Sequence, residues 1–192
     1  MSADRLKREI RSCTVCAEHL PLGPRPIVQF SPTSRIVVIG QAPGRITHES
    51  GLAFDDTSGH RLAEWLGVSF ATLHDPALFA IVSMAFCYPG KAAGGDKPPR
   101  PECAPTWHER VWAELAQDRL TLLVGTYAQR AYLPETKGWR MGERIAAYRT
   151  FLPAFFPLPH PAWRSTLFMR DNPWFGDSVI PALRELVRAK IA

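Results

Sequence analysis

Short runs of β-branched and other apolar residues recur along the chain. Residues 35–39 read Arg-Ile-Val-Val-Ile, and residues 78–86 form a longer apolar run. Residues 120–125 form a third run, and residues 151–158 form a fourth that is aromatic and interrupted by proline. Runs of this length and composition are typical of buried strands, so the sequence predicts four of them.

Between these runs, apolar residues recur every three or four positions, which is the period of an amphipathic helix. The predicted helices are 3–12, 59–68, 105–118, 126–133 and 176–190. Helices that alternate with strands predict a parallel sheet covered on both faces. We therefore expect the α/β class, as a three-layer α/β/α sandwich around a central, mostly parallel four-stranded sheet. No repeat or linker divides the chain, so residues 1–192 are predicted to form one domain.

Conspicuous residues follow three of the predicted strands. Gly40–Gly44 follow the first strand, Ser83 lies near the end of the second, and His160 comes after the last. In sheets of this kind, ligands bind outside the carboxyl ends of the strands. The order of elements therefore predicts a binding site that these residues share.

The composition excludes several classes of protein. The chain has 192 residues, of which 46% are hydrophobic and 21% charged, which is too apolar for a disordered chain. No run approaches the roughly 18 apolar residues of a membrane helix, and the N-terminal residues lack the apolar stretch of a secretory signal. We expect a cytoplasmic protein that does not span a membrane, with a monomer as the default. The net charge of +5 permits a polyanionic partner such as nucleic acid without requiring one.

Four cysteines have the spacing C-x2-C, a long gap, and C-x15-C. They are Cys13, Cys16, Cys87 and Cys103. In a reducing cytosol, four thiols indicate a metal or redox centre rather than disulfides. The Gly- and Pro-rich segment 87–103 would need something to pin both of its ends, which an iron–sulfur cluster or a zinc ion would supply. Four unrelated buried thiols are the plainer interpretation.

Each of the other motifs also has two interpretations. Gly40–Gly44, GQAPG, either cradles a ligand or turns the chain, and it is not a dinucleotide or phosphate-loop motif. Phe54 is either a stacking platform for a base or part of the core. Asp56 is either the cap of the following helix or a catalytic carboxylate. His160 lies between two prolines, which makes it a better candidate for a functional residue than a lone histidine usually is. Trp163 and Arg164 follow it, and an aromatic ring and a cation would suit contacts with stacked bases and a phosphate.

Taken together, these motifs resemble the uracil-DNA glycosylase superfamily, and within it the iron–sulfur branch known as families four and five. The likeness covers most of the chain, in order. It is carried by the four cysteines, by RIVVIGQAPG, GLAFDDTSGHRL and LTLLVGTYAQRAYL, and by LPHPAWR at the end. The resemblance implies the superfamily's α/β fold, a 4Fe-4S cluster held by the four cysteines, and action on DNA.

The sequence also departs from both families. Ser83 stands where family four has an Asn that reads the uracil edge, and Gln41 stands where its first motif has Glu. Ala42 replaces the Asp of the classical uracil enzymes. Asp56 falls in a D-x-S-G pattern that matches the catalytic Asp of family five, one residue closer to Phe54 than usual. We expect a hybrid, nearest to the branch with broad specificity.

The resemblance implies a DNA repair glycosylase that flips uracil, and other deaminated or damaged bases, out of DNA and hydrolyses the N-glycosidic bond. Asp56, His160 and Gln41 would be catalytic, and Trp163 and Arg164 would contact DNA.

The base would be bound by Gly40, Ala42, Phe54 and Ser83. A hydroxyl at Ser83 would discriminate less than an amide and so broaden the range of bases. No lysine has an evident nucleophilic position, so the reaction would end at an abasic site. A non-catalytic or covalently trapping member of the superfamily, and an unrelated iron–sulfur electron carrier, are the alternatives.

Overall fold

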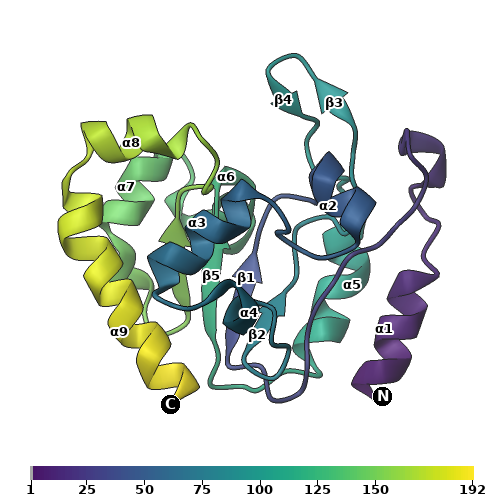
Figure 1. The fold of residues 1–192 in the computed structure, drawn as a ribbon, viewed down its shortest axis with the longest axis horizontal. Helices are drawn as coiled ribbons and strands as arrows, with labels where there is room; N and C mark the ends of the chain where they lie inside the picture. The colour runs from purple at the N-terminus through teal and green to yellow at the C-terminus, as the bar shows by residue number, and fades with distance from the viewer. Residues whose placement is uncertain (1) are drawn as a thin grey trace.

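The computed structural model describes residues 2–192, and its centre is a four-stranded sheet (Figure 1). The strands are β1 (Ile36–Ile39), β2 (Phe79–Ile81), β5 (Leu120–Val124) and β6 (Phe155–Leu158), in the order β2-β1-β5-β6. All three neighbouring pairs are parallel, and Ile36 pairs with Phe79 on one side and Leu120 on the other. The predicted α/β class and parallel sheet are confirmed.

The helices lie between and after these strands. They are α1 (Ala3–Arg11), α2 (Arg45–Ser50), α3 (Thr57–Leu66), α4 (Phe70–Leu73), α5 (Cys103–Trp112), α6 (Thr126–Tyr132), α7 (Met141–Ala146), α8 (Ser165–Asp171) and α9 (Ile180–Ile191). Short 3-10 turns occupy Ala17–His19, Pro134–Thr136 and Tyr148–Phe151, and a π-helical turn, Phe175–Val179, leads into α9. A small hairpin, β3 (Lys91–Ala92) with β4 (Gly95–Asp96), projects from the body (Figure 1).

The side chains of β1 alternate between two hydrophobic cores. Ile36 and Val38 belong to the core that packs against α3 and α9, whereas Val37 and Ile39 belong to the core under α1 and α5. Figure 1 shows these two pairs of helices on opposite sides of the strands. Because successive strand residues point to opposite faces, an all-apolar strand of this kind must be covered on both. The structure is therefore the predicted three-layer sandwich.

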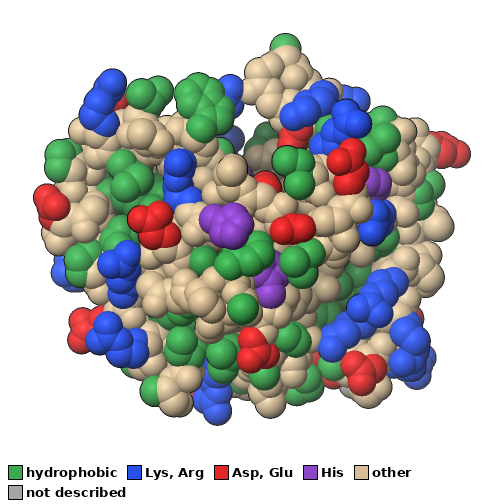
Figure 2. Space-filling view, in the orientation of Figure 1, with side chains coloured by type: hydrophobic (Ala, Val, Ile, Leu, Met, Phe, Trp, Pro, Cys, Tyr) green, Lys and Arg blue, Asp and Glu red, His purple; other side chains and the backbone are tan. Residues whose placement is uncertain are grey.

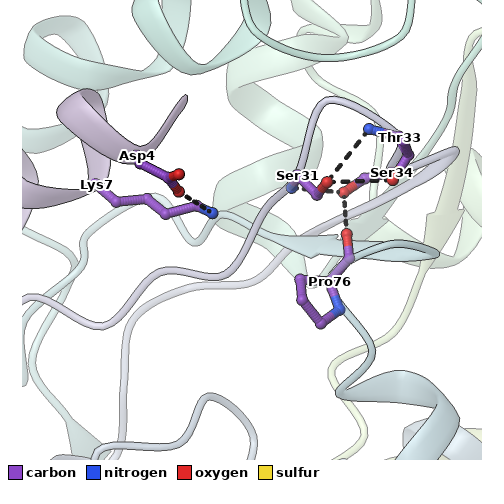
Figure 3. A network of polar contacts seen from close by, with 6 residues as sticks. All are labelled: Asp4, Lys7, Ser31, Thr33, Ser34 and Pro76. Carbon is purple, nitrogen blue, oxygen red and sulfur yellow. Dashed lines mark hydrogen bonds and ion pairs between the residues drawn. The ribbon is translucent and has the colours of Figure 1, made fainter. Parts of the chain in front are cut away.

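The N-terminal helix is fixed beside the entrance to β1 (Figure 3). Lys7 pairs with Asp4 and lies over the ring of the buried Phe30. The turn over residues 31–34, just before β1, is closed by Ser34. Its hydroxyl accepts a hydrogen bond from the amide of Ser31 and donates one to the carbonyl of Pro76 at 2.7 Å. These bonds tie the segment before β1 to the segment before β2.

Several predicted boundaries are wrong. The second strand ends at Ile81 rather than at residue 86, although the chain stays beside the continuation of β1, where the amide of Met84 donates to the carbonyl of Gly40 at 2.9 Å. The last strand begins at Phe155 rather than at residue 151, after a 3-10 turn and a proline.

The helices also differ from the prediction. The helix expected over 105–118 runs from Cys103 to Trp112. The closing helix is preceded by a π turn, and Pro181, which lacks an N–H, stands in its first turn. Helices α2, α4, α7 and α8 and the hairpin were not predicted from the sequence. Across the described residues, no helix is both long enough and apolar enough to cross a membrane.

Candidate active site

A cavity of about 530 Å³ opens at the carboxyl ends of the parallel strands. Its wall includes most of the residues that the sequence singled out: Gln41, Ala42, Phe54, Asp56, Ser83, His160, Trp163 and Arg164. Gly40 lies directly behind Phe54 and Ser83. Figure 2 shows a recess between the hairpin and the part of the molecule that bears α8, with Lys and Arg side chains on either side of it. The predicted convergence of these segments is present.

Phe54 is held in an unusual backbone conformation. Its φ of 56° lies in the left-handed region, where a residue with a side chain is uncommon. The first turn of α3 packs so closely that a Cβ at Gly59 would lie 1.8 Å from the carbonyl oxygen of Phe54. The phenyl ring reaches over Gly40, where an added Cβ would lie 3.1 Å from Cζ. Two glycines therefore allow the aromatic ring to form one wall of the cavity.

Two further contacts fix the loop that carries Phe54. The side chain of Asp56 accepts a hydrogen bond from the amide of Gly59 at 3.0 Å and so caps α3. The ring nitrogens of His74 lie 2.6 Å from the carbonyl oxygen of Ala53 and 2.8 Å from that of Phe70. The cap assigns one oxygen of Asp56 a structural role, and the side chain still lies on the cavity wall.

His160 enters the cavity after β6, beside Gly125, which directly follows β5. Burial lowers the pKa of His160, while the negative charges of Asp56 and Asp96 act in the opposite direction. The ring is therefore neutral at pH 7, and a neutral imidazole carries one N–H donor. Arg61 of α3 positions the next turn by donating to the carbonyl of Ala162 at 2.7 Å.

The hairpin supplies two charged residues that the sequence analysis missed. Asp96 and Lys91 both line the cavity and form an ion pair at 2.9 Å. A lysine thus lines the cavity, but it is paired with a carboxylate. Hydrogen bonding to Asp96 raises the pKa of Lys91, which keeps its amine protonated. The Gly94-Gly95 pair, with φ of 82° at Gly94, was the turn signal that could have revealed this hairpin.

Two predicted residues anchor the hairpin to the body. Arg164 donates to the carbonyl of Gly94 at 2.6 Å, and the side-chain amide of Gln41 donates to the carbonyl of Lys97 at 3.1 Å. Trp163 remains 67% exposed at the rim, with the guanidinium of Arg164 5.3 Å from its ring centre. The mouth of the cavity is therefore framed by the hairpin on one side and the turn after His160 on the other.

Ser83 is positioned by a buried histidine of α5. Nε2 of His108 lies 3.0 Å from the carbonyl oxygen of Ser83, and Nδ1 lies against the hydroxyl of Tyr132. Burial lowers the pKa of His108 to about 4. Because a carbonyl can only accept, the neutral ring must donate from Nε2 and accept from Tyr132. His108 and Tyr132 thus hold the end of β2, and neither was identified from the sequence.

The four cysteines meet at a second, small cavity. Cys13, Cys16, Cys87 and Cys103 line it together with Arg100 and Glu102. The amide of Phe86 donates to the sulfur of Cys103 at 3.3 Å. Burial raises the pKa of Cys87 to about 11 and that of Cys103 to about 12. Within residues 2–192, no group of three or more His, Cys, Asp or Glu side chains is arranged to hold a single metal ion.

A parallel α/β sheet with a polar, aromatic-walled cavity at its carboxyl ends places the protein among the α/β proteins that bind their ligands at that edge. Residues 27–184 match the family model of the uracil DNA glycosylase superfamily. This match covers most of the chain, and the protein belongs to that superfamily. Its members act on DNA, which is consistent with the cavity, the exposed Trp163 and the positive net charge.

The buried His108 predicts a pH dependence of stability. Below its ordinary pKa of about 6.5, the unfolded chain binds a proton on this ring, whereas the folded protein binds it only near pH 4. Between about pH 6.5 and pH 4 the unfolded state therefore binds more protons than the folded state, and the free energy of unfolding falls as the pH drops. Between pH 7 and 5 this group contributes a loss of about 2 kcal/mol.

Urea unfolding of the wild type and of His108→Gln at both pH values tests this expectation. Glutamine keeps an N–H donor for Ser83 but does not titrate. The variant should therefore lose about 2 kcal/mol less than the wild type on acidification. Equal losses in the two proteins would show that His108 is not buried as a neutral ring. Because all other titrating groups are shared, their effects cancel in the comparison.

Proposed function

We propose that this protein is a DNA glycosylase that excises uracil and other deaminated bases and leaves an abasic site. The observation that carries the proposal is the convergence of Phe54, Asp56, Ser83 and His160 on one cavity. A flipped base is flat, so it can stack on the ring of Phe54 while its edge faces Ser83.

In the proposed reaction, the bond between the base and the sugar breaks towards a sugar cation and an anionic base. The neutral His160 donates its N–H to the base oxygen as negative charge develops there. Asp56 orients the attacking water with the carboxylate oxygen that does not cap α3 and takes up its proton as the C–O bond forms, and its negative charge favours the sugar cation. The departing base is then protonated from solvent. Asp96 is already paired with Lys91, so we assign the water to Asp56.

We assign Gln41, Gly40 and Ala42 to the pocket wall beside the base, and Trp163 and Arg164 to the DNA at the rim. A protonated amine has no lone pair for attack on the sugar. Since Lys91 is held protonated, the proposed enzyme is monofunctional. A member of the superfamily that binds uracil or abasic DNA without turnover is the alternative outcome of the experiment below.

Excision of uracil from a labelled oligonucleotide under single-turnover conditions tests the assignment. We expect Asp56→Asn and His160→Gln each to lower the rate roughly 10²- to 10⁴-fold. Asp96→Asn removes the same charge from the same cavity and serves as the matched control, with a far smaller effect. Collapse of activity in Asp96→Asn alone would reassign the water to Asp96. Tight binding without excision by the wild type would support the non-catalytic alternative.

Ser83 is proposed to set the range of bases. A hydroxyl donates or accepts indifferently, whereas an amide presents a fixed donor and a fixed acceptor to the uracil edge. Ser83→Asn should therefore raise the preference for uracil over hypoxanthine and xanthine by roughly tenfold, about the value of one hydrogen bond. Single-turnover rates on the three bases measure this, with Ser83→Ala as the control. Strict specificity for uracil in the wild type would contradict the proposal.

We propose that the four cysteines hold a 4Fe-4S cluster. They fit this group because they share one cavity with apolar walls and a backbone amide already donates to one sulfur. Each thiolate of such a cluster binds a different iron, so the ligands stand farther apart than those of one zinc ion. Once bound, the cluster would tie the segment after α1 to the base of the hairpin and would have no part in the reaction.

Iron and sulfide analysis of the anaerobically purified protein tests the cluster. The wild type should be brown, with about four irons per chain. Cys103→Ser should lose most of the iron and the colour, whereas Ser12→Ala, beside Cys13, should keep both. A colourless wild-type protein with one zinc per chain would contradict the assignment, whether or not the cysteine variant folds.

A further inference from the structure

A second hollow, of about 700 Å³, adjoins the candidate active site. It lies between the start of α6, the loop over residues 133–140 and the start of α7, at the end of the molecule that bears the hairpin (Figure 1). Met141 lines both cavities. Gly125 lies beside His160, since an added Cβ would be 3.4 Å from Cβ of His160, and the next residue, Thr126, is on the wall of the second hollow. The two cavities are therefore neighbours, with Met141 on the wall of both.

The second hollow carries positive charge alone. Arg130, Lys137, Arg140 and Arg144 line it, and no acidic residue is among the described residues on its wall. Arg144 is buried and bound to Thr136, whereas the other three are exposed. Neither Arg130 nor Lys137 makes an ion pair or a side-chain hydrogen bond within residues 2–192. Two cations are thus available to an anionic ligand beside the active site.

An exposed tryptophan stands among these cations. Trp139 is 44% exposed and also borders a shallow hollow on its other side, with Glu143, so it forms a ridge. Its backbone is fixed, because its amide donates to the carbonyl of Thr136 at 3.0 Å. Cations that follow a groove together with an aromatic platform are the features that bind single-stranded nucleic acid, since every base can stack and every nucleotide carries a phosphate.

We propose that this hollow binds the unpaired DNA strand that adjoins the extruded nucleotide. Arg130 and Lys137 contact its phosphates, and Trp139 stacks on one of its bases. The inference rests on the proposed function and extends it, because it makes single-stranded DNA the preferred form of the substrate. A duplex would hold its bases stacked on one another and leave Trp139 without a partner.

The salt dependence of binding to an undamaged, fluorescently labelled single strand tests the phosphate contacts. Two lost contacts should reduce the slope of log Kd against log salt by about 1.4, at about 0.7 for each phosphate. The double variant Arg130→Ala/Lys137→Ala should show this reduction. The control Arg8→Ala/Arg188→Ala removes the same charge from exposed positions in α1 and α9 that line neither hollow, and should keep the wild-type slope. Equal slopes in the two double variants would overturn the proposal.

Trp139→Ala should weaken binding of the single strand roughly 5- to 100-fold without changing the salt slope. Binding of the matching duplex should change much less. Equal losses on both substrates would overturn the preference for single strands. Because undamaged DNA needs no catalysis, these measurements remain decisive if the wild type excises no base. If the wild type excises uracil but the variants bind the single strand as tightly as the wild type does, the proposed function stands and this inference is wrong.

Discussion

The contact between the first turn of α3 and the backbone of Phe54 organises the candidate site. Gly59 allows the helix to touch the carbonyl oxygen of Phe54, and the cap from Asp56 fixes the same turn. Farther along the helix, Arg61 holds the turn that follows His160. One helix thus positions the aromatic wall, the carboxylate and the histidine of the cavity relative to one another. Loosening this helix would disturb all three, and it would also move Ser58, a buried residue of α3 that lines the cavity.

The electrostatics of the cavity depend on burial more than on net charge. Burial keeps His160 neutral although Asp56 and Asp96 both act to raise its pKa. Burial likewise keeps His108 neutral, which determines the ring nitrogen that donates to Ser83. A neutral donor and a nearby carboxylate are suited to a reaction in which the base becomes negative and the sugar positive. The ion pair of Lys91 with Asp96 occupies the one lysine and the second carboxylate among the described residues that line this cavity.

The N-terminal segment and the hairpin are connected through the thiol cavity. Cys13 and Cys16 come from the segment after α1, whereas Cys87 and Cys103 bracket the loop that carries the hairpin. Gln41 and Arg164 bind the same loop from the opposite side. The frame of the cavity mouth is therefore held at both ends. A group bound to the cysteines would support the hairpin without contacting the base.

The sequence by itself determined the layers of the fold and the edge at which the site lies. The β-branched, all-apolar run at residues 36–39, followed by Gly40, favours a strand covered on both faces. The order of strands and helices then places Gly40, Ser83 and His160 at one edge. The motifs also identified Phe54 and Asp56, because the glycines around them are local features of the chain.

Only the tertiary structure decided how these residues are held. His108, Tyr132 and Arg61 have no local motif, since their partners lie between 24 and 104 residues away along the chain. The hairpin was missed because its strands have two residues each and carry no apolar period. The loop that carries its charged pair is held beside the cavity by Gln41 and by Arg164, whose partners lie 56 and 70 residues away along the chain. Contacts between distant segments set burial and hence charge state, and no pattern along the chain encodes them directly.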